Sequence, residues 1–88
     1  MRSRGDAVWF TVVGTQHYGV LIRTEDGEPG WIEAEFISDS PLPQSAWPPV
    51  GTSLQGLVLG YTRDGRIRIC LRTVDGITSP NQWPASNG

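Results

Sequence analysis

The apolar residues of this chain fall in short runs with a two-residue repeat, which is the period of a strand with one buried face. The alternation is cleanest over residues 66–72, where Ile67, Ile69 and Leu71 share one face. Arg66, Arg68, Cys70 and Arg72 share the opposite face of that segment. Similar runs, rich in β-branched and aromatic residues, occupy residues 7–15, 18–24, 31–33 and 54–61. The pattern predicts five short strands, with a single helical turn over residues 34–37.

The inward-facing positions of these strands give the predicted core. On the first strand Val8, Phe10 and Val12 share one face, and Trp9 lies on the other. The interior of a small barrel must be filled by side chains. We therefore expect a core built from Val8, Val12, Val20, Ile22, Ile32, Leu54, Val58, Ile67, Ile69 and Leu71.

Turn residues and prolines separate the predicted strands. Gly27 and Gly65 supply the positive φ of tight turns at Glu25-Asp26-Gly27-Glu28 and Thr62-Arg63-Asp64-Gly65. Residues 38–53 hold four of the seven prolines and so cannot form a central strand. We expect Trp47 to pin this connection to the core. Five strands with a long connection after the third favour the five-stranded Greek-key barrel, the OB-fold, over an SH3-like barrel.

The length of 88 residues allows one domain. We place it at residues 6–73, preceded by a flexible leader over 1–5 and followed by a flexible tail over 74–88, in which Trp83 is the candidate for docking. No apolar run is long enough to span a membrane, and the first ten residues do not resemble a signal peptide. Cys70 is the only cysteine, so an internal disulfide is excluded, and we expect a cytoplasmic location.

The charges are clustered rather than basic overall. The chain has seven arginines, no lysine and nine carboxylates, which gives a net charge of −2. Nucleic-acid binders are usually basic, so attraction to phosphate here must come from a local cluster. Four arginines lie within ten residues, Arg63, Arg66, Arg68 and Arg72, whereas five carboxylates lie between residues 25 and 35.

The side chains needed for catalysis or metal binding are scarce. His17 is the only histidine and Cys70 the only cysteine, so a zinc site is excluded. No second histidine or other base is available to form a nucleophilic pair with Cys70. The carboxylates show no spacing that places an acid–base couple on one face, and there is no glycine-rich phosphate loop. We expect neither an enzyme nor a cofactor.

Three motifs carry a family resemblance. They read Tyr18-Gly19-Val20-Leu21-Ile22, then Gly30-Trp31-Ile32-Glu33-Ala34-Glu35-Phe36-Ile37, and finally Gly65-Arg66-Ile67-Arg68-Ile69-Cys70-Leu71. Together with Gly5 and Gly51, they make residues 5–73 resemble the RNA-binding domain family named after ribosomal protein S1.

The resemblance implies a face for single-stranded RNA on the second, third and fifth strands. In that family bases stack on aromatic residues of the second strand, while a histidine of the third and an arginine of the fifth contact the backbone. Tyr18 and Arg66 keep the first aromatic residue and the arginine, whereas Leu21 replaces a second aromatic residue and Glu33 replaces the histidine. The implied site is Tyr18, Leu21, Arg23, Trp31, Glu33, Arg66 and Arg68, with Tyr18 stacking, Arg66 and Arg68 pairing with phosphates, and Arg23 supporting them.

A second hypothesis comes from the same residues. An OB module that binds a protein and has lost RNA binding would show the same features. These are the acidic net charge, the carboxylate at Glu33 and the apolar side chains of Trp9, Leu21 and Trp31. The charge over the candidate face separates the two hypotheses, because RNA needs a positive groove.

Overall fold

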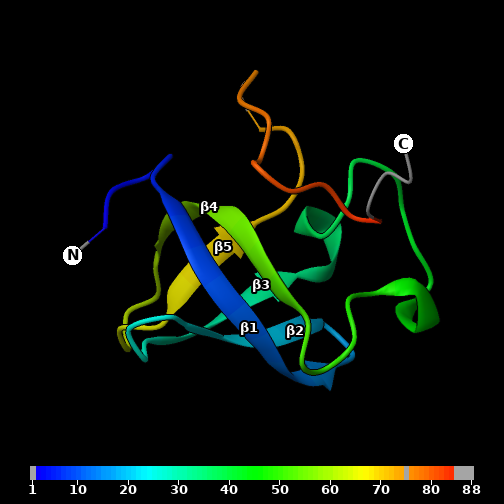
Figure 1. Cartoon of the computed structure of the whole chain (residues 1–88), viewed down its shortest axis with the longest axis horizontal. Helices are drawn as coiled ribbons and strands as arrows, with labels where there is room; N and C mark the ends of the chain where they lie inside the picture. The colour runs from blue at the N-terminus through cyan, green and yellow to red at the C-terminus, as the bar shows by residue number, and fades with distance from the viewer. Residues whose placement is uncertain (1, 75, 85–88) are drawn as a thin grey trace.

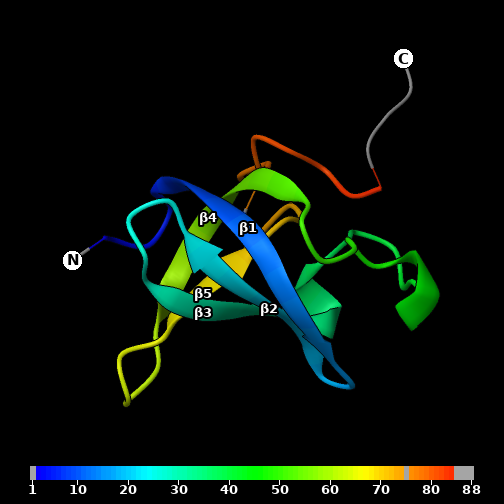
Figure 2. The same cartoon turned by 60° about the horizontal axis from the view of Figure 1, so that its bottom comes forward.

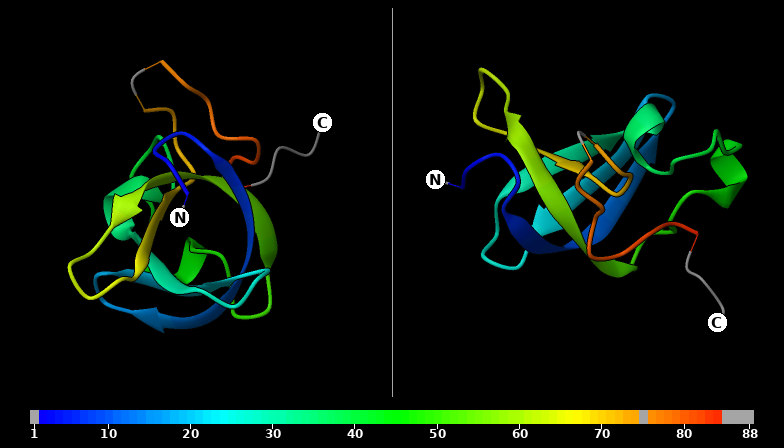
Figure 3. Two further views of the ribbon diagram at one scale, coloured as in Figure 1. Left: turned by 90° about the vertical axis from the view of Figure 1, so that its left-hand side faces the viewer. Right: turned by 90° about the horizontal axis from the view of Figure 1, so that it is seen from above.

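The computed structural model describes residues 2–74 and 76–84 and contains five strands that close into one barrel (Figure 1, Figure 3). The strands are β1 (Ala7–Gln16), β2 (Gly19–Thr24), β3 (Pro29–Glu33), β4 (Ser53–Tyr61) and β5 (Ile67–Cys70). Their order around the barrel is β1-β2-β3-β5-β4, and every neighbouring pair is antiparallel except β3 with β5. The predicted all-β, five-stranded barrel is confirmed.

The long connection between β3 and β4 contains two short 3-10 helices, η1 (Ala34–Phe36) and η2 (Gln44–Ala46). Trp47 packs against the core from this connection, as predicted, and its indole Nε1 donates to the carbonyl of Leu42 at 3.3 Å. Pro48 is fully buried. No helix in the described residues is long and apolar enough to cross a membrane.

The barrel interior contains nine of the ten predicted core residues. Leu54 is the exception, because it is only partly buried and packs against the edge of the core. Phe10, Ile37 and Leu57 are buried and were absent from the predicted core. Gly56 leaves room for the Phe10 ring, since a Cβ there would lie 3.2 Å from Phe10 Cε2 and 2.7 Å from a methyl of Ile69.

Cys70 was predicted to point outward, and this was wrong. Its side chain is completely buried, and its Sγ donates to the carbonyl of Arg72 at 3.1 Å. The covering residues come from a later segment, in which Val74 and Ile77 pair through their backbones and line a small hollow next to Cys70. Burial raises the pKa of the Cys70 thiol, so the reactive thiolate is disfavoured.

Both terminal segments make contacts with the barrel. The Arg2 guanidinium pairs with Glu28 and, at 2.8 Å, with Asp26, whose pKa it lowers. Asn81 exchanges two hydrogen bonds with the backbone of Gln55 on β4, and Trp83 Nε1 donates to the carbonyl of Ala46 at 2.7 Å. The docking of this segment is visible above the barrel in Figure 1. The flexibility of the leader and tail stays a prediction, and residues 75 and 85–88 lie outside the described residues.

Gly30 allows β3 to pair closely with β5. A Cβ at this position would overlap both the carbonyl oxygen and a methyl group of Ile67. We expect Gly30→Ala to lower the free energy of unfolding by about 1–3 kcal/mol, because strands must separate to admit the methyl group. Gly14→Ala is the matched control, since its Cβ would meet only the Leu21 side chain, at 3.4 Å. Urea denaturation of both variants measures the difference, and equal stabilities would contradict this tight pairing.

Candidate nucleic-acid interface

The strands β2, β3 and β5 are neighbours in the barrel wall (Figure 2). The strand register and the burial pattern place most of the predicted site residues on the outer face of this part of the wall. Leu21 on β2 pairs with Trp31 on β3, and Trp31 pairs in turn with Arg68 on β5. The buried residues Val20, Ile22 and Ile32 alternate with these positions, so their side chains occupy the opposite, inner face. The register therefore sets one apolar, one aromatic and one cationic residue in a row across three strands.

The end of this face next to the β1–β2 turn is aromatic. Tyr18 lies in the turn rather than within β2, and its side chain is 41% exposed. Its ring meets Trp31 edge to face at 5.7 Å between centroids and meets His17 in the same way at 5.3 Å. Trp31 is half-buried, and its Nε1 is buried without a hydrogen-bond partner among the described residues. The edge-to-face contact with Trp31 therefore braces the Tyr18 ring, and part of that ring stays accessible to solvent.

The opposite end of the face carries arginines around a shallow hollow of about 250 Å³. Arg23 and Arg66 line this hollow together with the apolar side chains of Val13 and Leu21. Arg23 donates to the carbonyl of Gly27 at 3.0 Å, which uses a neutral acceptor and leaves its charge uncompensated by that contact. Arg66 lies 3.4 Å from the Asp64 carboxylate, but the two side chains are 48% and 67% exposed, so water weakens this ion pair.

Arg68 is already paired within the protein. Its Nη2 and Nε lie 2.6 Å and 3.1 Å from the same oxygen of Glu33, and both side chains are about one-third exposed, at 34% and 33%. The sequence places on this face an arginine, Arg68, that is expected to pair with phosphate, and a carboxylate, Glu33, in the position of the family's histidine. The structure brings the two together, so this part of the face is close to neutral.

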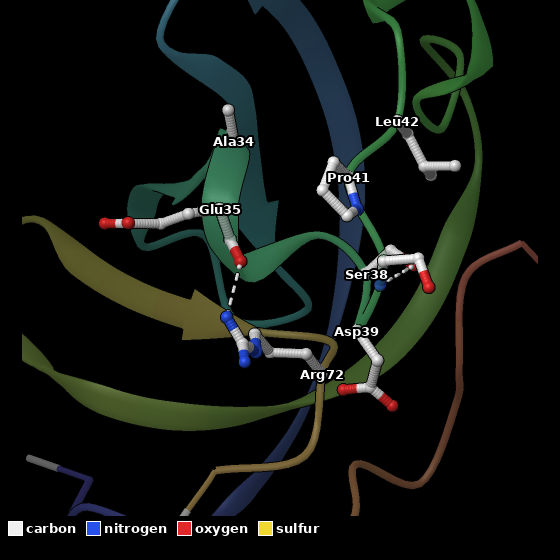
Figure 4. Close-up of a pocket in the computed structure, with 8 residues that line it drawn as sticks. Ala34, Glu35, Ser38, Asp39, Pro41, Leu42 and Arg72 are labelled. Carbon is white, nitrogen blue, oxygen red and sulfur yellow. Dashed lines mark hydrogen bonds between the residues drawn. The ribbon is translucent and has the colours of Figure 1, made fainter.

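Arg72 lies away from this face, in a hollow of about 320 Å³ between η1 and residues 38–42 of the long connection (Figure 4). Its Nη1 donates to the carbonyl of Glu35 at 3.1 Å, and its guanidinium lies over the Phe36 ring at 6.0 Å. Asp39 in the same hollow accepts from the backbone of Thr73 at 2.8 Å. These contacts tie η1 to the end of β5, so Arg72 braces the fold. The described residues contain no group of three or more side chains suited to hold a metal ion.

No protein-family model matches the chain, and no curated protein matches it.

Solved structures share its fold at low identity. A chain of the a/eIF2alpha–aDim2p–rRNA complex from Pyrococcus horikoshii OT3 superimposes with a TM-score of 0.75 and 18% identity, over 86% of this chain and 49% of that one. The intact alpha subunit of aIF2 from Pyrococcus abyssi superimposes with a TM-score of 0.75 and 19% identity, over 85% of this chain and 30% of that one. GSP13 from Bacillus subtilis superimposes with a TM-score of 0.71 and 17% identity, over 91% of this chain and 67% of that one.

This chain thus spans half or less of the two archaeal chains. At these identities the likeness establishes the fold, and it agrees with the strand order and the parallel β3–β5 pair. The protein therefore has the S1-like OB-fold, an all-β closed barrel of five strands.

Proposed function

We propose that this chain is a non-catalytic module that binds single-stranded RNA on the outer face of β2, β3 and β5. The observation that supports it is the layout of this face, which has an exposed, braced tyrosine at one end and two arginines at the other. Single-strand binding uses aromatic platforms for bases and positive grooves for the backbone. A chain of the same fold was solved in a complex with rRNA, which adds support from outside the protein.

Each residue of the face has a role in this proposal. Tyr18 stacks on a base, and Arg23 and Arg66 pair with the phosphates of neighbouring nucleotides. Leu21 and Val13 form the apolar floor between them. Arg68 contributes only when a phosphate competes with Glu33 for its guanidinium.

A protein partner is the second candidate. It is favoured by the net charge of −2, by the neutral Glu33–Arg68 pair and by the exposed Val13, which is 48% exposed beside Leu21. The arginine end of the face favours RNA.

Titration of labelled, mixed-sequence single-stranded RNA at several salt concentrations tests the proposal. Two phosphate contacts predict a slope of about −1.4 for the logarithm of the association constant against the logarithm of salt concentration. Duplex RNA of the same sequence should bind more weakly, because its bases cannot reach Tyr18. Absence of binding to single-stranded RNA at low salt would reject RNA in favour of the protein-partner hypothesis.

Glu33→His should tighten RNA binding. The substitution removes a carboxylate from the face and releases Arg68 from its ion pair. The repulsion of a carboxylate and a phosphate ~5–6 Å apart in water is about 0.7–0.8 kcal/mol, so affinity should rise roughly threefold or more at low salt. Screening should reduce the gain at high salt.

The matched control for this variant is Glu35→Gln, which removes an exposed carboxylate that lines the hollow around Arg72 and has no ion pair to Arg68. It should change affinity much less than Glu33→His. Measuring both variants against one RNA at two ionic strengths decides the matter. An affinity for Glu33→His no higher than that of the parent at low salt would mean that Glu33 does not face the ligand.

A further inference from the structure

An exposed tryptophan on β1 is not used by the face described above. Trp9 is 47% exposed on the outer side of the barrel, where alternation with the buried Val8 and Phe10 places it. It lines a hollow of about 370 Å³ together with Thr11, Glu25 and Ser53. That volume is within the range of small-ligand sites, which run from about 300 to 1,000 Å³.

Glu25 is the one carboxylate of the β2–β3 turn that is left without a partner. Asp26 and Glu28 both pair with Arg2, whereas the Glu25 side chain has no hydrogen bond or ion pair among the described residues. Its backbone N–H donates to the carbonyl of Trp9 at 3.0 Å, which holds the two residues side by side. The hollow therefore combines an exposed indole with an available carboxylate.

This hollow adjoins the proposed RNA face. Thr11 lines it, and the cross-strand partner of Thr11 on β2 is Arg23, which lines the hollow at the arginine end of that face. Thr11 and Ser53 share a hydroxyl hydrogen bond of 3.0 Å, so the wall of the Trp9 hollow is polar and can donate or accept. A nucleotide whose phosphate met Arg23 would be next to the Trp9 hollow.

We propose that the Trp9 hollow binds a guanine base of the RNA strand, with Trp9 stacking on the base and Glu25 reading its Watson–Crick edge. An ionised carboxylate only accepts hydrogen bonds, and it has two oxygens side by side. Guanine offers two adjacent donors, its N1–H and its N2 amino group, whereas adenine and cytosine offer one amino group and uracil one N–H between two acceptors. This site rests on the proposed RNA-binding function and adds base specificity to it.

The test compares three RNA probes: a uridine hexanucleotide, the same strand with one central guanosine, and the same strand with inosine in its place. One good bidentate contact predicts about tenfold tighter binding of the guanosine strand than of the uridine strand. Inosine lacks the amino group, so its strand should fall between the other two. Glu25→Gln should abolish the preference, because its amide NH₂ is a donor and would meet a donor of the guanine edge. Glu35→Gln should keep the preference.

Trp9→Ala provides the second arm. It should bring the guanosine strand to the affinity of the uridine strand, while Ile77→Ala, which trims another exposed apolar side chain, should leave the affinities unchanged. Circular dichroism of each variant checks that the barrel is retained. If the parent binds the uridine strand but shows no preference for guanosine, the guanine site is wrong and the RNA face stands. If the parent binds none of the three strands at low salt, both proposals fail.

Discussion

Ile69→Ala should destabilise the barrel by about 2–5 kcal/mol, the largest effect that we expect from a single substitution. Ile69 is completely buried on β5, and one of its methyl groups lies over Gly56. Truncation leaves a cavity that the closed sheet cannot collapse to fill. Domains have a total stability of roughly 5–15 kcal/mol, so the loss is a large part of it. The melting temperature should fall by about 4–8 °C for each kcal/mol.

Val50→Ala is the control, because it trims an aliphatic side chain that is 63% exposed. Exposed substitutions away from special features usually change stability by within about 0.5 kcal/mol. Thermal and urea denaturation of the two variants measure the contrast. A melting temperature of Ile69→Ala equal to that of the parent would show that this side chain is not packed in the interior.

The strands and most of the core could be predicted because they depend on local pattern. The interior of the barrel is apolar, so Ile67 and Ile69 alternate with arginines in the sequence itself. The alternation failed at Cys70 because β5 ends there and Val74 and Ile77 lie over its outer side. That cover comes from a segment without strand periodicity, so the sequence contained no signal for it.

The residues missing from the predicted core depend on neighbours far away in the sequence. Phe10 fits inside only because Gly56, on the partner strand, has no side chain. Ile37 follows η1 and is buried where the long connection begins, a place without a two-residue repeat. Leu54 is less buried than predicted because it lies at the start of β4, where the first three residues are exposed or only partly buried.

The sequence could predict which residues share the candidate face, but not the charge pairing on it. The resemblance identified Tyr18 and Arg66, and the structure leaves both exposed. The pairing of Glu33 with Arg68 joins residues 35 positions apart, and it follows from the parallel register of β3 and β5. Sequence spacing could not show that register. Arg68 was therefore assigned a phosphate contact, and its ion pair with Glu33 was not predicted. The contact of Tyr18 with Trp31 is hidden in the same way.

Tyr18→Ala should weaken binding of single-stranded RNA by about 1–3 kcal/mol, roughly five- to 150-fold in the dissociation constant. The exposed tyrosine ring, braced by Trp31, offers a face to a base before RNA arrives, so little ordering opposes the stacking. Stacking releases no counterions, so the salt dependence of binding should remain that of the parent. Titrations of one RNA at several salt concentrations measure both quantities.

Arg66→Ala should behave differently with the same RNA. Loss of one phosphate contact should flatten the salt slope by about 0.7 and weaken all sequences alike. Arg63→Ala is the matched control, because it removes an equal charge that is exposed in the β4–β5 turn outside the hollow at the arginine end of the face. Its effect should be small and vanish at high salt. Equal changes of slope in the Tyr18 and Arg66 variants would refute stacking by Tyr18, because only a contact that releases counterions can change that slope.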